Sequence, residues 1–269
     1  MQLRSKLLAL AAGLAFAASA QADIKIGVIS SATGPVSLIG IPQKNTVALM
    51  PTEIAGEKVE YITFDDASDP SNTVTLIKKL ISEENIDALV GPSSSPNAMA
   101  ILDFIAEAKV PTLAPVGTIA IVLPMDDKRR WVFKTTQNDG LVADKLFKHM
   151  KETGKKTVGF IGTGDTFGET WYKVAQDYAK KYGIEIVANE RFKRPDTSVT
   201  GQALKVLSAK PDAVLIAAPG GPAVLPQATL TDMGYKGTFY QTHGAALKEF
   251  IKLGGKKVEG TILGGSLML

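Results

Sequence analysis

The sequence predicts an α/β protein of two similar lobes, each a parallel sheet with helices on both faces. Two observations support this prediction. Short apolar runs of strand length alternate with longer amphipathic segments along the chain, and successive βα units of this kind form a parallel sheet that is covered on both sides. The alternation pauses near residue 130 and then starts again, so we expect one set of units on either side of that point.

The composition is that of an ordinary globular protein. The chain has 269 residues, of which 45% are hydrophobic and 21% are charged, and this length suits one large or two medium domains. It has no cysteine and only two histidines, His149 and His243. A structural zinc site is therefore not expected. The prediction includes no metal and no cofactor.

Residues 1–22 are predicted to be a secretory signal peptide. A short basic start is followed by an apolar run over residues 7–18 and by the cleavage pattern Ala20-Gln21-Ala22, with Ala18-Ser19-Ala20 as a competing pattern. The apolar run is too short for a stable membrane span. The mature chain is expected to begin near Asp23, outside the cytoplasm. Loss of Arg4 and Lys6 lowers the formal net charge from +3 to +1. A nearly neutral chain without a basic stripe is not expected to bind nucleic acid or an anionic membrane.

The first lobe is expected over residues 23–131. Its helices carry apolar residues at spacings of three and four, and Pro42 marks the first turn of one helix or a kink in it. The acidic turn at 65–72 ends in residues that cap helices, which favours turn formation over an acid pair at Asp65 and Asp66. The predicted strands are 24–29, 58–64, 87–90 and 110–115, and the predicted helices are 36–50, 73–82 and 97–109.

The second lobe is expected over residues 132–262. A strand at 129–135 is predicted to cross between the lobes, and residues 263–269 are predicted to begin a return to the first lobe. Between them the same alternation recurs. The predicted strands are 157–162, 184–188, 213–218, 237–241 and 259–264, and the predicted helices are 140–153, 167–182, 199–209, 221–233 and 244–253.

A weak similarity between two segments of the sequence favours a ligand site between the lobes. The strand at 87–90 with its Gly/Pro/Ser loop is similar to the strand at 212–215 with the loop at 219–222. Ligands of parallel sheets bind at the carboxyl ends of the strands. Two facing lobes would both present such loops to a cleft, which suits capture of a small ligand.

The serine loop, residues 91–96, is the strongest single candidate for a site. It joins a buried strand to a helix and holds three consecutive serines. The positive end of the helix dipole and free backbone N–H groups there would favour a carboxylate or a phosphate. The alternative is that one serine only caps the helix.

Enzymatic hypotheses have little support in the sequence. Residues 162–168 have the spacing GxGxxxG, one residue longer than the dinucleotide-binding fingerprint, and no GxSxG, HExxH or phosphate-loop motif is present. We therefore expect no enzymatic activity.

These motifs together resemble the periplasmic ligand-binding proteins of the branched-chain amino acid type, the leucine-binding protein family with the type I fold. The resemblance rests on motifs that occur in the family's order: the export signal, Ile24-Lys25-Ile26-Gly27-Val28, Thr33-Gly34-Pro35, Asp65-Asp66-Ala67-Ser68-Asp69-Pro70, the serine loop, Ala114-Pro115-Val116-Gly117-Thr118, Val132-Phe133-Lys134-Thr135-Thr136, residues 162–168 and Val258-Glu259-Gly260-Thr261. It implies a three-segment hinge, a periplasmic location, and delivery of a solute to the permease subunits of an ABC importer. We expect a monomer.

The resemblance also implies site residues. Ser95 matches the serine that binds the ligand carboxylate, and Ser94 beside it is included in the expected site. Val116 and Thr118 match a pair that acts largely through backbone groups and the Thr hydroxyl. Phe167 matches an aromatic residue that closes on the ligand from the second lobe.

Other positions depart from the leucine-type pattern. Ile39 and Pro219 stand where leucine-type binders carry tyrosines, and His243 stands where they carry a glutamate that pairs with the ligand's ammonium. An imidazole is neutral or positive and cannot replace that glutamate. Ser68 and Ser94 replace a cysteine pair of those binders.

The sequence therefore predicts the solute-binding subunit of an ABC importer that captures a small carboxylate, either an aromatic acid or a hydrophobic amino acid, with an amine-free acid fitting His243 better. The alternative is a ligand-sensing module of the same fold coupled to a signalling partner. Family members usually continue for about another hundred residues, so the C-terminal part of the fold is expected to be missing from this chain.

Overall fold

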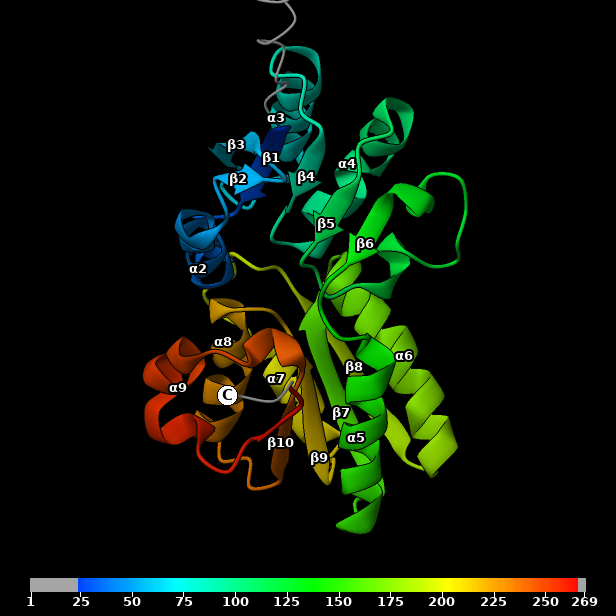
Figure 1. Ribbon diagram of the computed structural model, residues 1–269. Helices are drawn as coiled ribbons and strands as arrows, with labels where there is room; N and C mark the ends of the chain where they lie inside the picture. Colours follow the sequence, from blue (N-terminus) through cyan, green and yellow to red (C-terminus); the bar gives the residue numbers. More distant parts are fainter. Residues whose placement is uncertain (1–23, 266–269) are drawn as a thin grey trace, which may run out of the picture.

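The computed structural model describes residues 24–265 and shows two lobes, each built on its own sheet (Figure 1). The first sheet has the strand order β2-β3-β1-β4-β5-β6, and the second has the order β11-β10-β9-β7-β8. All pairings are parallel except the one between β2 and β3. The predicted fold class is confirmed.

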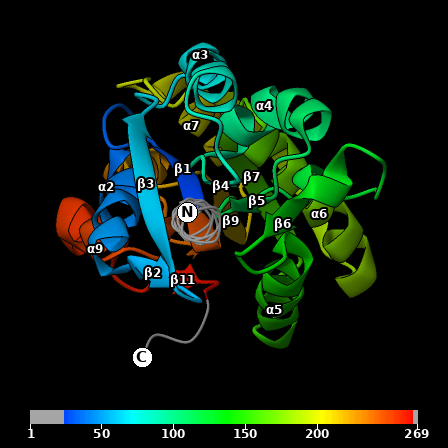
Figure 2. The same ribbon diagram turned by 45° about the horizontal axis from the view of Figure 1, so that its top comes forward.

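The first sheet extends slightly farther along the chain than the sequence indicated. The segment β6 pairs in parallel with β5, and its Val132 is buried in the first-lobe core. It is therefore the edge strand of the first sheet (Figure 2), and the second lobe begins after Lys134 rather than at residue 132. The strands are β1 (Ile24–Ser30), β2 (Glu53–Ile54), β3 (Glu57–Asp65), β4 (Ala88–Val90), β5 (Thr112–Ala114) and β6 (Val132–Lys134).

Three helices complete the first lobe: α2 (Ser37–Thr46), α3 (Pro70–Ser82) and α4 (Ser95–Ala108). The Asp69 carboxylate accepts hydrogen bonds from the first turn of α3, and Pro70 occupies a position where no intrahelical N–H is needed, so α3 begins three residues before its predicted start. Side chains Ile77 of α3 and Ile101 of α4 are fully buried against the sheet. Short 3₁₀ turns lie at Val47–Leu49, Ile119–Ile121 and Arg129–Trp131.

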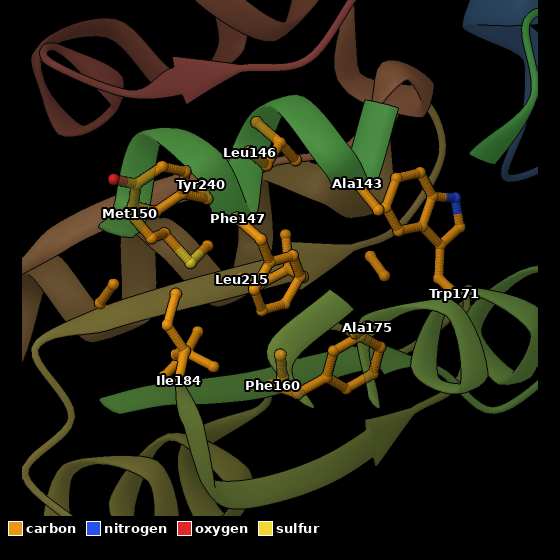
Figure 3. Close-up of a cluster of buried hydrophobic side chains, with 14 of the residues drawn as sticks. Ala143, Leu146, Phe147, Met150, Phe160, Trp171, Ala175, Ile184, Leu215 and Tyr240 are labelled. Carbon is orange, nitrogen blue, oxygen red and sulfur yellow. The ribbon is translucent and has the colours of Figure 1, made fainter. Parts of the chain in front are cut away.

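The second sheet is covered on both faces by helices. One face carries α5 and α6, whose Phe147 and Trp171 belong to the same buried hydrophobic cluster as Tyr240 of the sheet (Figure 3). The other face carries α7, α8 and α9, which contribute Val206, Leu230 and Phe250 to a second cluster. The elements are β7 (Thr157–Thr163), β8 (Glu185–Phe192), β9 (Ala213–Ala217), β10 (Thr238–Gln241), β11 (Ile262–Leu263), α5 (Asp139–Glu152), α6 (Thr166–Tyr182), α7 (Thr200–Ser208), α8 (Val224–Asp232) and α9 (Lys248–Gly254).

Residues 135–138 are the one connection between the lobes within the described part of the chain. Leu263 still belongs to the second sheet, where β11 pairs with β10. The predicted signal peptide and residues 266–269 of the predicted return to the first lobe lie outside the described residues. Between residues 24 and 265, no helix has the length and apolar character needed to cross a membrane.

Candidate functional site

A cavity of about 230 Å³ lies between the lobes, where strands of both sheets end. Six of the eight predicted site residues line it: Ile39, Ser94, Ser95, Phe167, Pro219 and His243. Val116 and Thr118 are buried beside it, and only Gly117 between them reaches the wall. The remaining lining residues are Gln43, Ser93, Pro115, Thr136, Gln137, Arg194, Gly244, Ala246 and Leu247.

The serine loop is held against β1 by a glycine that no other residue could replace without strain. Gly91 has φ of +116°, and a Cβ at this position would lie 2.0 Å from the Ile29 carbonyl oxygen. Farther along, the Ser93 hydroxyl accepts a hydrogen bond from the Ser31 N–H at 3.0 Å. These contacts fix the three serines at the cavity, with at most 5% of each residue exposed.

The three hydroxyls have different protein partners. The Ser94 hydroxyl donates to Asn97 Oδ1 at 2.6 Å, whereas Ser95 Oγ accepts from the Thr118 N–H at 3.2 Å. Ser95 therefore keeps its own proton available for an acceptor in the cavity. Ser94 occupies the N-cap position of α4, yet its side chain forms no capping hydrogen bond. The capping alternative thus does not explain the serine run.

A buried polar network braces the loop from behind. Asn97 Nδ2 donates to Asp66 Oδ2 at 2.7 Å and to Thr73 Oγ1 at 2.8 Å, while its carbonyl oxygen accepts from Ser94. Asp66 also accepts from the Ser68 N–H, in agreement with the turn interpretation of this acidic segment. The network fixes the start of α4 at the cavity.

Thr118 links the two lobes instead of lining the cavity. Its hydroxyl lies 2.8 Å from that of Thr170 on α6. The neighbouring Gly117 leaves room for the second lobe, because a Cβ there would lie 2.5 Å from Phe167 Cε2 and 3.0 Å from His243 Nε2. The first lobe thus presents bare backbone to the two aromatic rings of the second.

An aromatic cluster forms the second-lobe wall. Phe167 lies at the start of α6, which Asp165 caps by accepting from the Phe167 N–H at 2.9 Å. The Phe167 and His243 ring centroids are 6.0 Å apart, and those of Trp171 and His243 are 5.7 Å apart. Trp171 is fully buried behind both rings. The wall is therefore a packed aromatic surface around one imidazole.

His243 has an acidic neighbour that the sequence did not reveal. Asp139, at the start of α5, is fully buried, and its Oδ1 lies 3.7 Å from His243 Nε2. Burial raises the pKa of Asp139 to about 7, although the charge of Lys134 and the Ile119 backbone N–H oppose this rise. Burial and the same Lys134 charge lower the pKa of His243 to about 4. His243 is therefore uncharged at neutral pH.

Arg194 is the one cationic side chain among the described residues that line the cavity, and it too was missed. Its Nε donates to Asp165 Oδ2 at 2.6 Å. The sequence predicted that the preceding strand would end at 188, but β8 continues to Phe192. The residues just after Phe192 were therefore not considered as a strand-end loop, which was the signal that could have found Arg194.

No carboxylate lines this cavity within residues 24–265. Asp139 lies behind His243, and Asp165 is paired with Arg194. In the same part of the chain, no cluster of three or more His, Cys, Asp or Glu side chains is arranged to hold a metal ion. The polar groups at the cavity are thus hydroxyls, backbone groups, amides, a neutral imidazole and a guanidinium.

Comparisons with known proteins agree with this architecture. The family described as "Periplasmic binding protein" matches residues 23–268. The Leu/Ile/Val-binding protein BraC3 of Rhizobium johnstonii is 29% identical over 271 residues, which cover 97% of this chain and 72% of that protein.

Two solved structures, both extracellular ligand-binding receptors from Rhodopseudomonas palustris HaA2, are also similar. One is 49% identical with a TM-score of 0.88 and the other is 38% identical with a TM-score of 0.86. Each match covers 90% of this chain, but only 67% and 66% of the respective receptor. The resemblance found in the motifs is confirmed. The chain belongs to the periplasmic binding protein family, in its branched-chain amino acid group with the type I fold.

Proposed function

We propose that this protein is the solute-binding subunit of an ABC importer and that it captures a small carboxylate without an amine. The observation that carries the proposal is the lack of a carboxylate among the described lining residues, together with an uncharged His243 at the position of the ammonium partner in leucine-type binders. Relatives are named for Leu, Ile and Val, and these amino acids all bring an ammonium. Burying that ammonium here without a negative partner would be unfavourable.

The two ends of the cavity suit the two parts of such a ligand. Ser95 and the start of α4 provide a hydroxyl proton and the positive end of a helix for the carboxylate. Ile39, Phe167, Pro219 and Leu247 provide apolar surface for an aromatic or branched body. The ligand class is therefore an aromatic or branched monocarboxylic acid.

Binding without chemistry fits the contacts of the polar residues. Ser95 Oγ is engaged with the Thr118 N–H and has no base beside it among the described contacts, so it lacks the activation that a nucleophile needs. The protein is proposed to act as a periplasmic monomer, closing its lobes on the solute and passing it to membrane permease subunits.

A ligand screen with matched pairs tests this proposal. We expect benzoate, 3-phenylpropanoate and 4-methylpentanoate to raise the melting temperature of the full chain, because they leave no ammonium to satisfy. Phenylalanine and leucine, which have the same bodies with an added amine, should give no shift. A shift with leucine and none with 4-methylpentanoate would contradict the proposal.

The Ser95→Ala variant tests the carboxylate position. Loss of a hydroxyl that donates to a charged group should weaken binding by about 1–3 kcal/mol, measured by calorimetry with the best acid of the screen. Ser82→Ala is the control, because the Ser82 hydroxyl only donates to the Lys78 carbonyl within α3. Equal affinity of Ser95→Ala and wild type would remove Ser95 from the site.

A further inference from the structure

We propose that Arg194 binds the ligand carboxylate from the second lobe, opposite the serine loop, so that both lobes hold the same anion. This rests on the proposed function, because it takes the ligand to be a carboxylate. Nothing in the motifs or the family resemblance assigns a role to Arg194. Three features of the molecule carry the proposal: its position, its unused donors, and a comparison with a neighbouring arginine.

The backbone of Arg194 is fixed in a tight turn just after β8. The Lys193 N–H donates to Asp196 Oδ2 at 2.8 Å, and the Asp196 N–H donates to the Lys193 carbonyl at 3.0 Å. The side chain is 10% exposed and lines the cavity together with the serines. It also borders an adjacent groove whose first-lobe wall includes Pro96, next to Ser95. Arg194 thus lies at the end of the cavity where α4 begins.

Most of the guanidinium donors have no partner within residues 24–265. Only Nε is engaged, by Asp165 at 2.6 Å, and Nη2 is buried without an acceptor among the described residues. Buried donors are normally satisfied. The edge formed by Nη1 and Nη2 has the spacing of the two oxygens of a carboxylate. A ligand carboxylate would supply the acceptor that this edge lacks.

Arg191 shows how a purely structural arginine is bonded in the same region. Its Nε and Nη2 donate to the two carboxylate oxygens of Glu169 at 2.6 and 3.3 Å, and its Nη1 donates to Asn189 and to the Glu190 carbonyl. Every nitrogen of Arg191 therefore has a protein acceptor. If Arg194 served only to neutralise Asp165, the same two-point pairing would be expected. It binds Asp165 through one nitrogen instead.

Asp165 acts as a positioning residue for Arg194. Its other oxygen caps α6, so the carboxylate cannot move away from the helix that carries Phe167. Burial raises the pKa of Asp165, but the Arg194 charge and several hydrogen bonds outweigh burial and hold the pKa below its usual value. The carboxylate thus stays ionised, and it holds the guanidinium at the cavity before a ligand arrives.

Calorimetry on the full chain tests this assignment, with benzoate as the probe and 4-methylpentanoate as a second acid. Arg194→Gln should lower the affinity for the acid at least about tenfold, because a charge-assisted interaction is lost. Arg194→Lys keeps the positive charge but loses the two parallel N–H donors of the guanidinium. Its affinity for the acid should therefore lie between those of wild type and Arg194→Gln. The control Arg191→Gln should bind like wild type. Wild type should also prefer benzoate over benzamide, and Arg194→Gln should lose that preference.

The outcomes separate this proposal from the proposed function. If wild type binds neither acid, both proposals are overturned. If wild type binds benzoate and Arg194→Gln binds it equally well with benzamide still discriminated, Arg194 is only a partner of Asp165 and this proposal alone is overturned. Circular dichroism and thermal unfolding show whether each variant is folded. Should Arg194→Gln fail to fold, wild-type affinity in a folded Arg194→Lys would equally overturn it.

Discussion

Asp139 and His243 form a buried acid–base pair behind the cavity wall, and together they hold a constant number of protons over a wide pH range. In the folded protein the pKa of Asp139 is about 7 and that of His243 is about 4, so the pair carries one proton between these values. In the unfolded chain the ordinary values are 3.8 and 6.5, and the pair again carries one proton between them. Stability depends on pH only where the two states bind different numbers of protons. The intact pair therefore adds little pH dependence between about 4 and 6.5.

Removing either member of the pair should reveal the pH dependence that the other member gives to the free energy of unfolding. Burial is the main cause of both shifts and remains in the single variants. In His243→Gln, the folded state holds the Asp139 proton more tightly than the unfolded state, so the free energy of unfolding should fall as pH rises from about 4 to about 7. In Asp139→Asn, the unfolded state protonates His243 more readily, so the free energy of unfolding should fall as pH drops from about 6.5 to about 4.

Urea unfolding at pH 4.5, 5.5, 6.5 and 7.5 measures these slopes. Wild type should show the flattest dependence, with the two variants sloping in opposite directions. Parallel curves for the two variants would contradict the opposite pKa shifts of Asp139 and His243.

The residues of the site differ in how far the sequence could predict them. Ser95, Phe167 and His243 lie in the segments that come after predicted strands, and the structure places all three at one cavity. Asp139 could not be found in this way, because it starts a helix and comes near His243 only through the packing of α5 against the sheet. Sequence periodicity contains no information on such a contact between distant segments.

The start of α4 depends on side chains from a different helix and turn. Asn97 joins the serine loop to the buried Asp66, and Ser68 of the same acidic turn donates to the Thr33 carbonyl at 2.7 Å. Ser68 and Ser94 therefore stabilise two different parts of the first lobe through hydrogen bonds. The α4 terminus is fixed by polar packing.

Asn97→Ala should destabilise the protein and weaken ligand binding together. The change removes the amide that donates to Asp66 and Thr73, so a buried carboxylate loses a partner, and about 1.5–3 kcal/mol of unfolding free energy should be lost. Urea unfolding and calorimetry measure the two effects. The control Asn72→Ala removes only a long contact with the Asp65 carbonyl and should change stability by less than about 0.5 kcal/mol. Equal effects of the two variants would contradict a special role for the Asn97 network.

At the scale of elements, the sequence predicted the larger helices and most strands but not their ends. The strand β8 continues to Phe192 although its last positions before Phe192 carry Asn189, Glu190 and Arg191, because its pairing with β7 outweighs the low strand propensity of these residues. The hairpin strand β2 consists of only two residues, and both are exposed, so it leaves no apolar pattern to detect. Element ends are set by partners that local sequence does not specify.

One hydrogen bond between the lobes is well suited to report closure. The hydroxyls of Thr118 and Thr170 meet at 2.8 Å across the cleft. The two-lobe division itself was visible in the repeated alternation of the sequence, whereas this contact was not, because it joins side chains 52 residues apart. The hydrogen bond between Thr118 and Thr170 should stabilise the form in which the two lobes are closed on each other.

Thr170→Val should weaken ligand binding by about 0.5–1.5 kcal/mol, because the shape is kept while the hydrogen bond to Thr118 of the other lobe is lost. The change also removes the hydrogen bond that the Thr170 hydroxyl donates to the Thr166 carbonyl within α6. Small-angle scattering during a benzoate titration should show compaction at higher ligand concentration than in wild type. The control Thr229→Val loses only a bond of the within-helix kind, from the Thr229 hydroxyl to the Leu225 carbonyl on α8. If both variants titrate like wild type, the Thr118 contact does not contribute to closure.

The position of Trp171 gives this protein a built-in optical reporter. Its indole lies against the imidazole of the cavity wall, while the other tryptophan, Trp131, packs in the first lobe. Indole emission responds to nearby charge and polarity, so an anion entering the cavity should change the signal of Trp171 and leave that of Trp131 nearly constant. Replacing Trp131 by Phe would leave Trp171 as the single tryptophan, and occupancy of the cavity could then be followed in real time without a label.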